Sequence, residues 1–229
     1  MNFTVVIIII FAIIALIVAG VIVSHKQAEG RKKELAGWAF SKSLNFSPAR
    51  DAGIDNRYDF KCLRRGENRY GYNIIEGNLG NRPMSAFDYH YETHHTDSKG
   101  NRHTQHHYFS AVIVDANLPL KPLFIRSERL LDKLTEFIGF DDIDFESAEF
   151  SKKFYVKSPD KKWAYDVLHQ ATMEFMLGAS RFDIEFGIRH VIAYRNNTFK
   201  MQEFEEAINL VNGILDRLPE SLIQELKGK

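Results

Sequence analysis

Residues 3–23 form an unbroken apolar segment, FTVVIIIIFAIIALIVAGVIV, without a charged side chain. At about 1.5 Å rise per residue, a helix of this length spans roughly 31 Å, the thickness of a bilayer hydrocarbon core. A helix is expected because it satisfies its own backbone hydrogen bonds in lipid. The segment is longer than the apolar region of a signal peptide, and no Lys or Arg precedes it. We therefore expect a transmembrane helix within residues 1–25, in contact with the lipid bilayer through residues 3–23.

The charges beside this segment predict its orientation. No charged side chain precedes it, whereas Lys26, Arg31, Lys32 and Lys33 follow it. Positively charged flanks stay on the cytoplasmic side of a membrane. The single cysteine, Cys62, agrees with a reducing compartment. The sequence thus predicts a single-pass protein of the inner or plasma membrane whose C-terminal domain is cytoplasmic.

Composition excludes several classes of protein. Lys and Arg together number 30, as do Asp and Glu, so the formal net charge is zero and a dedicated nucleic-acid-binding protein is not expected. Hydrophobic residues make up 45% of the chain, which suffices for a packed core. A lone Cys62 excludes an intramolecular disulfide and a four-cysteine zinc site. The sequence has no phosphate-binding Gly-rich loop, dinucleotide fingerprint or nucleophile elbow, so we expect no catalytic residues.

The remainder of the chain indicates one α+β domain. We expect a basic, partly helical linker over residues 26–48, the domain over 49–220 and a C-terminal tail over 221–229. Alternating patterns predict strands from about 57 to 115 and a short strand at 123–125, and the two longest strands cover 85–95 and 102–115 with a hairpin turn at 97–101. The later expected elements are helices at 127–137, 160–178 and 200–218, a strand at 150–157 and a hairpin at 182–194. This pattern favours a mainly antiparallel sheet with three or more helices.

Six of the nine histidines lie in the expected hairpin, at positions 90, 94, 95, 103, 106 and 107. If the turn centres on residues 99 and 100, Glu92 lies opposite His107, and His94 lies diagonal to His103 and His107. The same face carries Asp88, His90 and Gln105, and the opposite, core-facing side carries Phe87, Tyr89, Tyr91, Tyr108, Val112 and Val114.

Carboxylates and imidazoles are ligands of zinc and similar divalent ions. Three such groups can hold one ion and leave a coordination position open. The sequence therefore predicts a metal site made by Glu92, His94, His103 and His107. The spacing matches no known zinc signature, and a shift of one residue in register would divide the set between two faces. A solvated hairpin with a His-rich tip and a pH-sensitive surface remain the alternatives.

Several motifs, in order along the chain, resemble a family of uncharacterised bacterial single-pass membrane-anchored proteins. They are Trp38, Leu44-Asn45-Phe46, Arg57-Tyr58-Asp59-Phe60, Gly66, Phe87-Asp88-Tyr89-His90-Tyr91, Gly139-Phe140-Asp141-Asp142-Ile143-Asp144-Phe145 with Phe150 and Phe154, and Trp163-Ala164-Tyr165-Asp166-Val167-Leu168. The resemblance covers roughly residues 35 to 219. It implies an N-terminal anchor and an α+β domain, and it implies no activity or catalytic residue.

These observations together predict a membrane-anchored binding or scaffold module in the cytoplasm. Its expected partners are the lipid bilayer and a membrane or cytoplasmic protein, and no nucleic acid. No cofactor is expected for such a module. The alternative is a metal-dependent enzyme, or a metal or pH sensor, that uses the His-rich hairpin 88–107 with zinc or a similar divalent ion.

Overall fold

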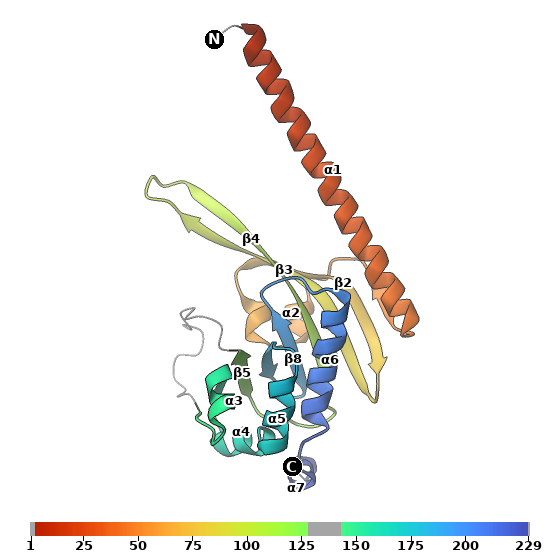
Figure 1. The fold of residues 1–229 in the computed structure, drawn as a ribbon, viewed down its shortest axis with the longest axis vertical. Coiled ribbons are helices and arrows are strands. Elements are labelled where there is room, and N and C mark those ends of the chain that lie inside the picture. Colours follow the sequence, from red (N-terminus) through yellow and green to blue (C-terminus); the bar gives the residue numbers. More distant parts are fainter. Residues whose placement is uncertain (1–2, 128–142, 229) are drawn as a thin grey trace.

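The computed structural model describes residues 3–127 and 143–228. One long helix, α1 (Phe3–Ser41), leads into a domain built on an eight-stranded sheet. The N-terminal half of α1 stands clear of the domain, and its C-terminal end lies against it (Figure 1). By length and composition, the described helix Ile9–Ser41 is apolar enough to cross a membrane, and its most apolar stretch is not buried in the protein.

All neighbouring strands in the sheet run antiparallel, in the order β1-β2-β3-β4-β8-β7-β5-β6. The strands are β1 (Asn45–Ser47), β2 (Glu67–Leu79), β3 (Arg82–Thr96), β4 (Arg102–Asp115), β5 (Leu123–Ser127), β6 (Phe154–Lys157), β7 (Asp183–Phe186) and β8 (His190–Arg195). The shorter helices are α2 (Ile54–Arg57), the 3-10 helix η1 (Lys61–Arg64), α3 (Ala148–Lys153), α4 (Lys161–Val167), α5 (Gln170–Gly178), α6 (Met201–Leu215) and α7 (Glu220–Lys227). The prediction of an α+β fold with a mainly antiparallel sheet is confirmed.

The central strands are buried on both faces. One face of the sheet packs against helices of the domain and forms the larger core, which contains Ala86, Val112 and Val114. Phe87, Tyr89 and other alternate residues point into a smaller core that α2 and η1 cover. The prediction of a single core face was wrong, because separate elements cover each face of the sheet.

The C-terminal end of α1 belongs to the larger core. Leu35 and Ala39 are fully buried, and the Trp38 ring stacks on Phe204 of α6 with 6.1 Å between ring centroids. The indole Nε1 of Trp38 donates a hydrogen bond of 2.9 Å to Glu205. The expected linker is therefore a helical continuation of the apolar segment up to Ser41, and it is packed on the domain.

Several element predictions need correction. The helix expected over 160–178 is two helices, α4 and α5, separated at Leu168 and His169, where neither Gly nor Pro marks a break. Asp160 nevertheless caps α4, since its side chain accepts from the Trp163 amide. The strand pattern around Cys62 forms α2 and η1 instead, because Ile54, Cys62 and Leu63 all cover the smaller core.

The end of the chain also differs from the predicted pattern. Residues 150–157 divide between α3 and β6, and the helix expected over 127–137 lies largely outside the described residues. Residues 220–227 form α7, and Leu222 and Leu226 are buried. The packed core therefore extends beyond residue 220 into the segment expected to be a tail.

Candidate functional site

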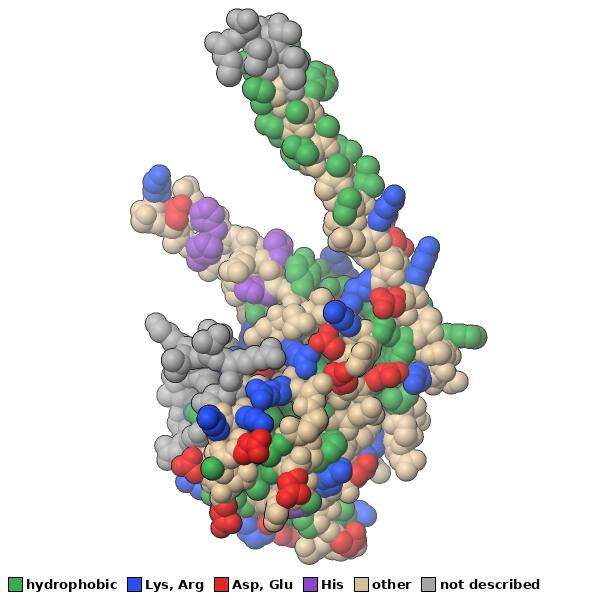
Figure 2. Space-filling view, viewed as in Figure 1, with side chains coloured by type: hydrophobic (Ala, Val, Ile, Leu, Met, Phe, Trp, Pro, Cys, Tyr) green, Lys and Arg blue, Asp and Glu red, His purple; other side chains and the backbone are tan. Residues whose placement is uncertain are grey.

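The hairpin of β3 and β4 is longer than the strands beside it. β2 pairs with β3 only as far as Glu92, and β8 pairs with β4 only from Ser110 onward. Among the described strands, residues 93–96 and 102–105 pair only with each other. We call residues 93–107 the ribbon. It projects from the domain on the side where the N-terminal half of α1 stands (Figure 1), and histidines line it (Figure 2).

The register of the hairpin differs by one residue from the predicted register. Glu92 lies opposite His106 rather than His107, and His95 lies opposite His103. The cause is the turn, where the Asp97 amide donates to the Asn101 carbonyl at 2.9 Å and the Asp97 carboxylate accepts from two further amides. This loop leaves three residues between the paired positions, with Gly100 at φ +84°, whereas we assumed a two-residue turn.

The shift places the four expected ligands on two faces of the ribbon, since adjacent positions in a strand point to opposite sides. Glu92 and His94 lie on one face, and His103 and His107 lie on the other. The three histidines of the predicted set each contact a different partner. His94 contacts Thr104 and Glu67, His103 contacts Asp97 at 3.1 Å, and His107 contacts Thr93 at 2.8 Å and stacks on Tyr91. The geometry of the predicted set was therefore wrong, and metal binding by the hairpin stays a prediction.

The observed register brings a different set of side chains together at the base of the ribbon. His90 Nε2 lies 3.1 Å from His106 Nδ1, and His106 Nδ1 lies 3.3 Å from Glu92 Oε1. The third distance, from His90 Nε2 to Glu92 Oε1, is 3.9 Å. We call His90, Glu92 and His106 the His90 cluster. Its two imidazoles and one carboxylate form a group of the size and chemistry that hold a metal ion.

The surroundings of the His90 cluster are partly closed. His90 is only 3% exposed, and its ring stacks on Tyr70 and contacts the ring of Tyr108. Burial lowers the pKa of His90, which favours the neutral imidazole. A side-chain hydrogen bond from Asn68 lowers the pKa of Glu92 and favours the carboxylate. An open cavity of about 480 Å³ adjoins the cluster, and Arg50, Tyr70 and Tyr108 contribute to its walls.

Two residues before His90, on the same face of β3, lies the fully buried Asp88. Its carboxylate accepts hydrogen bonds from Arg31 of α1, Asn73 of β2 and Ser110 of β4. Arg31 also donates to the Phe199 carbonyl at 2.8 Å. This polar network attaches the long helix to the centre of the sheet.

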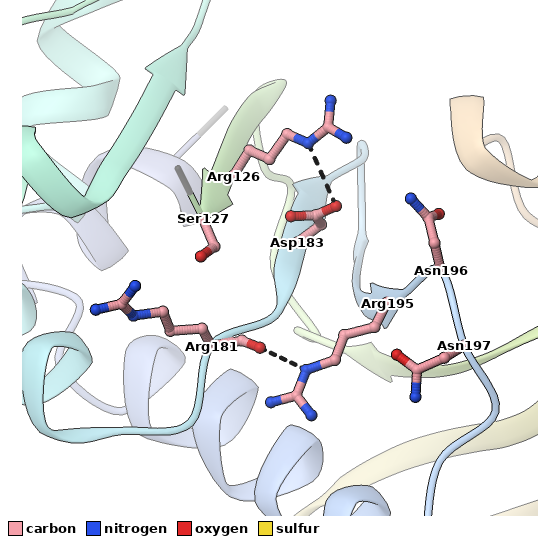
Figure 3. A pocket seen from close by; sticks show the side chains of 7 residues that line it. All are labelled: Arg126, Ser127, Arg181, Asp183, Arg195, Asn196 and Asn197. Atoms are coloured by element: carbon pink, nitrogen blue, oxygen red, sulfur yellow. Dashed lines mark hydrogen bonds and ion pairs between the residues drawn. The ribbon is translucent and has the colours of Figure 1, made fainter. Parts of the chain in front are cut away.

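A second cavity, of about 200 Å³, lies where β5 and β8 end and β7 begins (Figure 3). Its walls are formed by Arg126, Ser127, Arg181, Asp183, Arg195, Asn196 and Asn197. Arg126 pairs with Asp183 at 3.6 Å, and Arg195 pairs with Glu203. Two of the three guanidinium groups are thus already neutralised by carboxylates, and in Figure 3 the three groups point in different directions. The cavity is polar, but it is a less complete ligand site than the His90 cluster.

The ligand set predicted from the sequence omitted His106, and the sequence did not indicate the cavity in Figure 3. The signal for His106 was present, because the segment from Asp97 to Gly100 permits a three-residue loop as well as a two-residue turn. The cavity had no local signal, because its residues come from three separate segments around Arg126, Asp183 and Arg195.

No protein-family model and no curated protein matches the sequence. Among solved structures, the chain is similar to the crystal structure of the mycobacterial trehalose monomycolate transport factor A, TtfA. The TM-score is 0.62 at 10% sequence identity, and the match covers 82% of this chain and 93% of that chain. A likeness at this identity concerns the fold, and it leaves the family resemblance suggested by the sequence motifs as a prediction.

Proposed function

We propose that this protein is a single-pass membrane protein that holds a cytoplasmic binding or scaffold domain in a fixed orientation at the membrane. The observation that carries the proposal is the continuity of α1. The same helix contains the apolar segment, the buried core residues Leu35 and Ala39, and Arg31, which binds buried Asp88. A domain attached in this way moves with its anchor.

The helix also limits the distance between the domain and the bilayer. Only residues 24–30 separate the apolar segment from Arg31, and a helix of that length covers about 10 Å. The ribbon projects on the same side of the domain as the apolar half of α1 (Figure 1). The proposed arrangement therefore places the ribbon beside the headgroup region or beside neighbouring membrane proteins.

The ribbon is the surface on which a protein partner is expected to bind. Residues 93–96 and 102–107 have no outer neighbour strand within the described part of the sheet. Strands with free edges bind extended segments of other proteins by continuing the sheet. The similar fold of a transport factor supports an accessory role of this kind and does not identify a cargo.

The anchor and its orientation can be tested in cells that produce the full chain. The protein should stay in the membrane pellet after alkaline carbonate extraction, and the double variant Ile13→Arg/Ile14→Arg should be released. A C-terminal epitope should become accessible to antibody only after the cells are permeabilised. Extraction of the unaltered chain, or labelling of the epitope on intact cells, would contradict the proposal.

The partner surface can be tested by site-specific photocrosslinking in membranes. A photoreactive residue at Gln105, exposed on the ribbon, should give an adduct of defined mass, whereas the same residue at exposed Lys161 in α4 should not. Identical adduct patterns from both positions, or none from Gln105, would reject the ribbon as the binding surface. A metal-dependent role is the second candidate function, and the convergence of His90, Glu92 and His106 favours it.

A further inference from the structure

We propose that His90, Glu92 and His106 bind one divalent transition-metal ion, such as zinc, at the base of the ribbon. This site is independent of the membrane anchor. Two imidazole nitrogens and one carboxylate oxygen are a ligand set that zinc uses where it keeps a fourth position open. The three ligands come from β3 and β4, at positions that the hairpin register holds directly opposite or two residues apart.

The distances fit an ion between the three atoms. Metal bonds of 2.0–2.1 Å in a tetrahedral arrangement place ligand atoms about 3.3 Å apart. In the structure, His90 Nε2 and His106 Nδ1 are 3.1 Å apart, and Glu92 Oε1 lies 3.3 Å from His106 Nδ1. Only the separation of 3.9 Å between His90 and Glu92 must shorten. Small rotations of side chains suffice, and the backbone need not move.

The tautomer of His90 also suits a ligand. Its Nδ1 lies 3.1 Å from the Asn68 carbonyl oxygen. A carbonyl only accepts hydrogen bonds, so Nδ1 carries the proton and the lone pair of Nε2 faces Glu92 and His106. Metal-bound histidines commonly donate their second nitrogen to a carbonyl in this way.

Asn68 orients a second ligand as well. Its side-chain amide donates a hydrogen bond of 2.9 Å to Glu92 Oε2, which leaves Oε1 directed at the histidines. Asn68 occupies a left-handed conformation, with φ +49°, inside the irregularity where the pairing of β2 with β3 shifts between Glu67 and Tyr70. Because of this bulge, the backbone carbonyl and the side-chain amide of Asn68 both contact the His90 cluster. Asn68 is therefore a positioning residue for the site.

Burial differs among the ligands in a way that leaves one side open. The His90 side chain is 3% exposed and that of Glu92 is 14% exposed, whereas that of His106 is 53% exposed. The open side faces the cavity lined by Arg50 and Tyr70. Water or a small anion would complete the coordination there, and Arg50, which lies over the Tyr70 ring, is one of the cations that line this cavity.

The test uses the full chain in detergent, purified without a histidine tag, loaded with zinc chloride and desalted. Elemental mass spectrometry should find zinc at close to one equivalent per chain, and loading with cobalt should give the visible absorption of a four-coordinate site. His106→Ala and Glu92→Gln should abolish both signals. His106 is exposed, so its replacement leaves the fold intact, which circular dichroism verifies.

The matched controls are His94→Ala and His103→Ala, which lie on the same ribbon outside the cluster and should keep full zinc occupancy. Asn68→Ala should weaken zinc binding by about 10- to 100-fold, as expected for a group that orients ligands. The proposal is overturned if the unaltered chain takes up no zinc, if His106→Ala retains it, or if His94→Ala or His103→Ala alone removes it. Any of these results would leave the cluster as a hydrogen-bonded group only.

Discussion

Arg31 in α1 and Asp88 in β3 lie 57 residues apart in sequence and form a two-point ion pair. Arg31 Nε donates to Asp88 Oδ2 at 2.7 Å, and Nη2 donates to Oδ1 at 2.6 Å. Asp88 is fully buried, and Asn73 and Ser110 donate further hydrogen bonds to it. One side chain of α1 thus compensates the charge at the centre of the sheet.

Arg31→Ala should destabilise the domain strongly. The variant leaves the buried Asp88 carboxylate without its cation, and removing one partner of a buried pair typically costs about 3–5 kcal/mol. Urea unfolding of the full chain in detergent measures the loss. Lys32→Ala is the matched control, since Lys32 pairs with Glu29 at a half-exposed position, and this variant should unfold close to the unaltered chain. Equal stability of the two variants would show that the pair does not hold α1 to the sheet.

The double variant Arg31→Met/Asp88→Asn separates the cost of the unpaired charge from the cost of lost packing. Neutral side chains of similar size at both positions remove the buried charge, and such replacements are often tolerated. We expect the double variant to be more stable than Arg31→Ala in the same urea experiment. A double variant less stable than Arg31→Ala would show that packing of the Arg31 side chain dominates.

Gly66 lies against the backbone at the base of the ribbon, and Gly80, in the turn between β2 and β3, is its matched control. Both have positive φ, +61° and +70°, but a Cβ at Gly66 would lie 2.1 Å from the Glu92 carbonyl oxygen and one at Gly80 would meet nothing within 4 Å. Gly80→Ala should cost about 1–2 kcal/mol for the left-handed conformation alone. Gly66→Ala should cost more, because β3 must move at Glu92, and it should also weaken zinc binding. Equal costs in thermal unfolding would contradict the close approach.

Local signals in the sequence predicted much of this fold. The length of the apolar segment, the Asp160 cap and the hairpin loop at Gly100 act over a few residues, and each marked a helix or a turn correctly. The boundary between α4 and α5 had no such signal, so helical periodicity alone predicted one helix.

The candidate site could be predicted only in part, because it depends on register and on long-range contacts. The sequence placed the histidines on a hairpin, yet one extra residue in the loop exchanged His107 for His106 opposite Glu92. Asn68 orients Glu92 from another strand, and Arg31 pairs with Asp88 from another element. Neither relationship has a spacing that a single sequence reveals.

Shortening the ribbon should leave the domain and the metal site intact. His94 and Thr104 are directly paired, so an Asn-Gly turn can replace residues 95–103. Among the described strands, the removed residues pair only with each other, and we expect the free energy of unfolding to change by less than about 0.5 kcal/mol. Zinc occupancy should persist, whereas the photocrosslink from Gln105 should decrease. A large loss of stability would show that the tip contributes to the domain.

Glu185 in β7 should make stability fall as the pH rises. Burial raises the pKa of Glu185 to about 7, although the Lys61 amide donates to Oε1 at 3.2 Å, and the buried Oε2 has no hydrogen-bond partner among the described residues. The unfolded chain has a glutamate pKa near 4.3, so the folded state binds the proton more tightly between these values. The stabilisation from this proton is complete below about pH 4 and is lost as the pH rises through about 7, by on the order of 3 kcal/mol.

Glu185→Gln tests this dependence, because the amide is neutral at every pH in this range. Urea unfolding at pH 5 and pH 8 measures the free energy of unfolding. From pH 5 to pH 8 this free energy should fall for the unaltered chain because Glu185 loses its proton, and it should fall less for the variant. The variant should therefore be the more stable protein at pH 8. Glu146→Gln, at an exposed position, controls for the loss of one negative charge and should keep the original slope. If Glu185→Gln keeps that slope as well, the buried carboxyl is not the group that titrates.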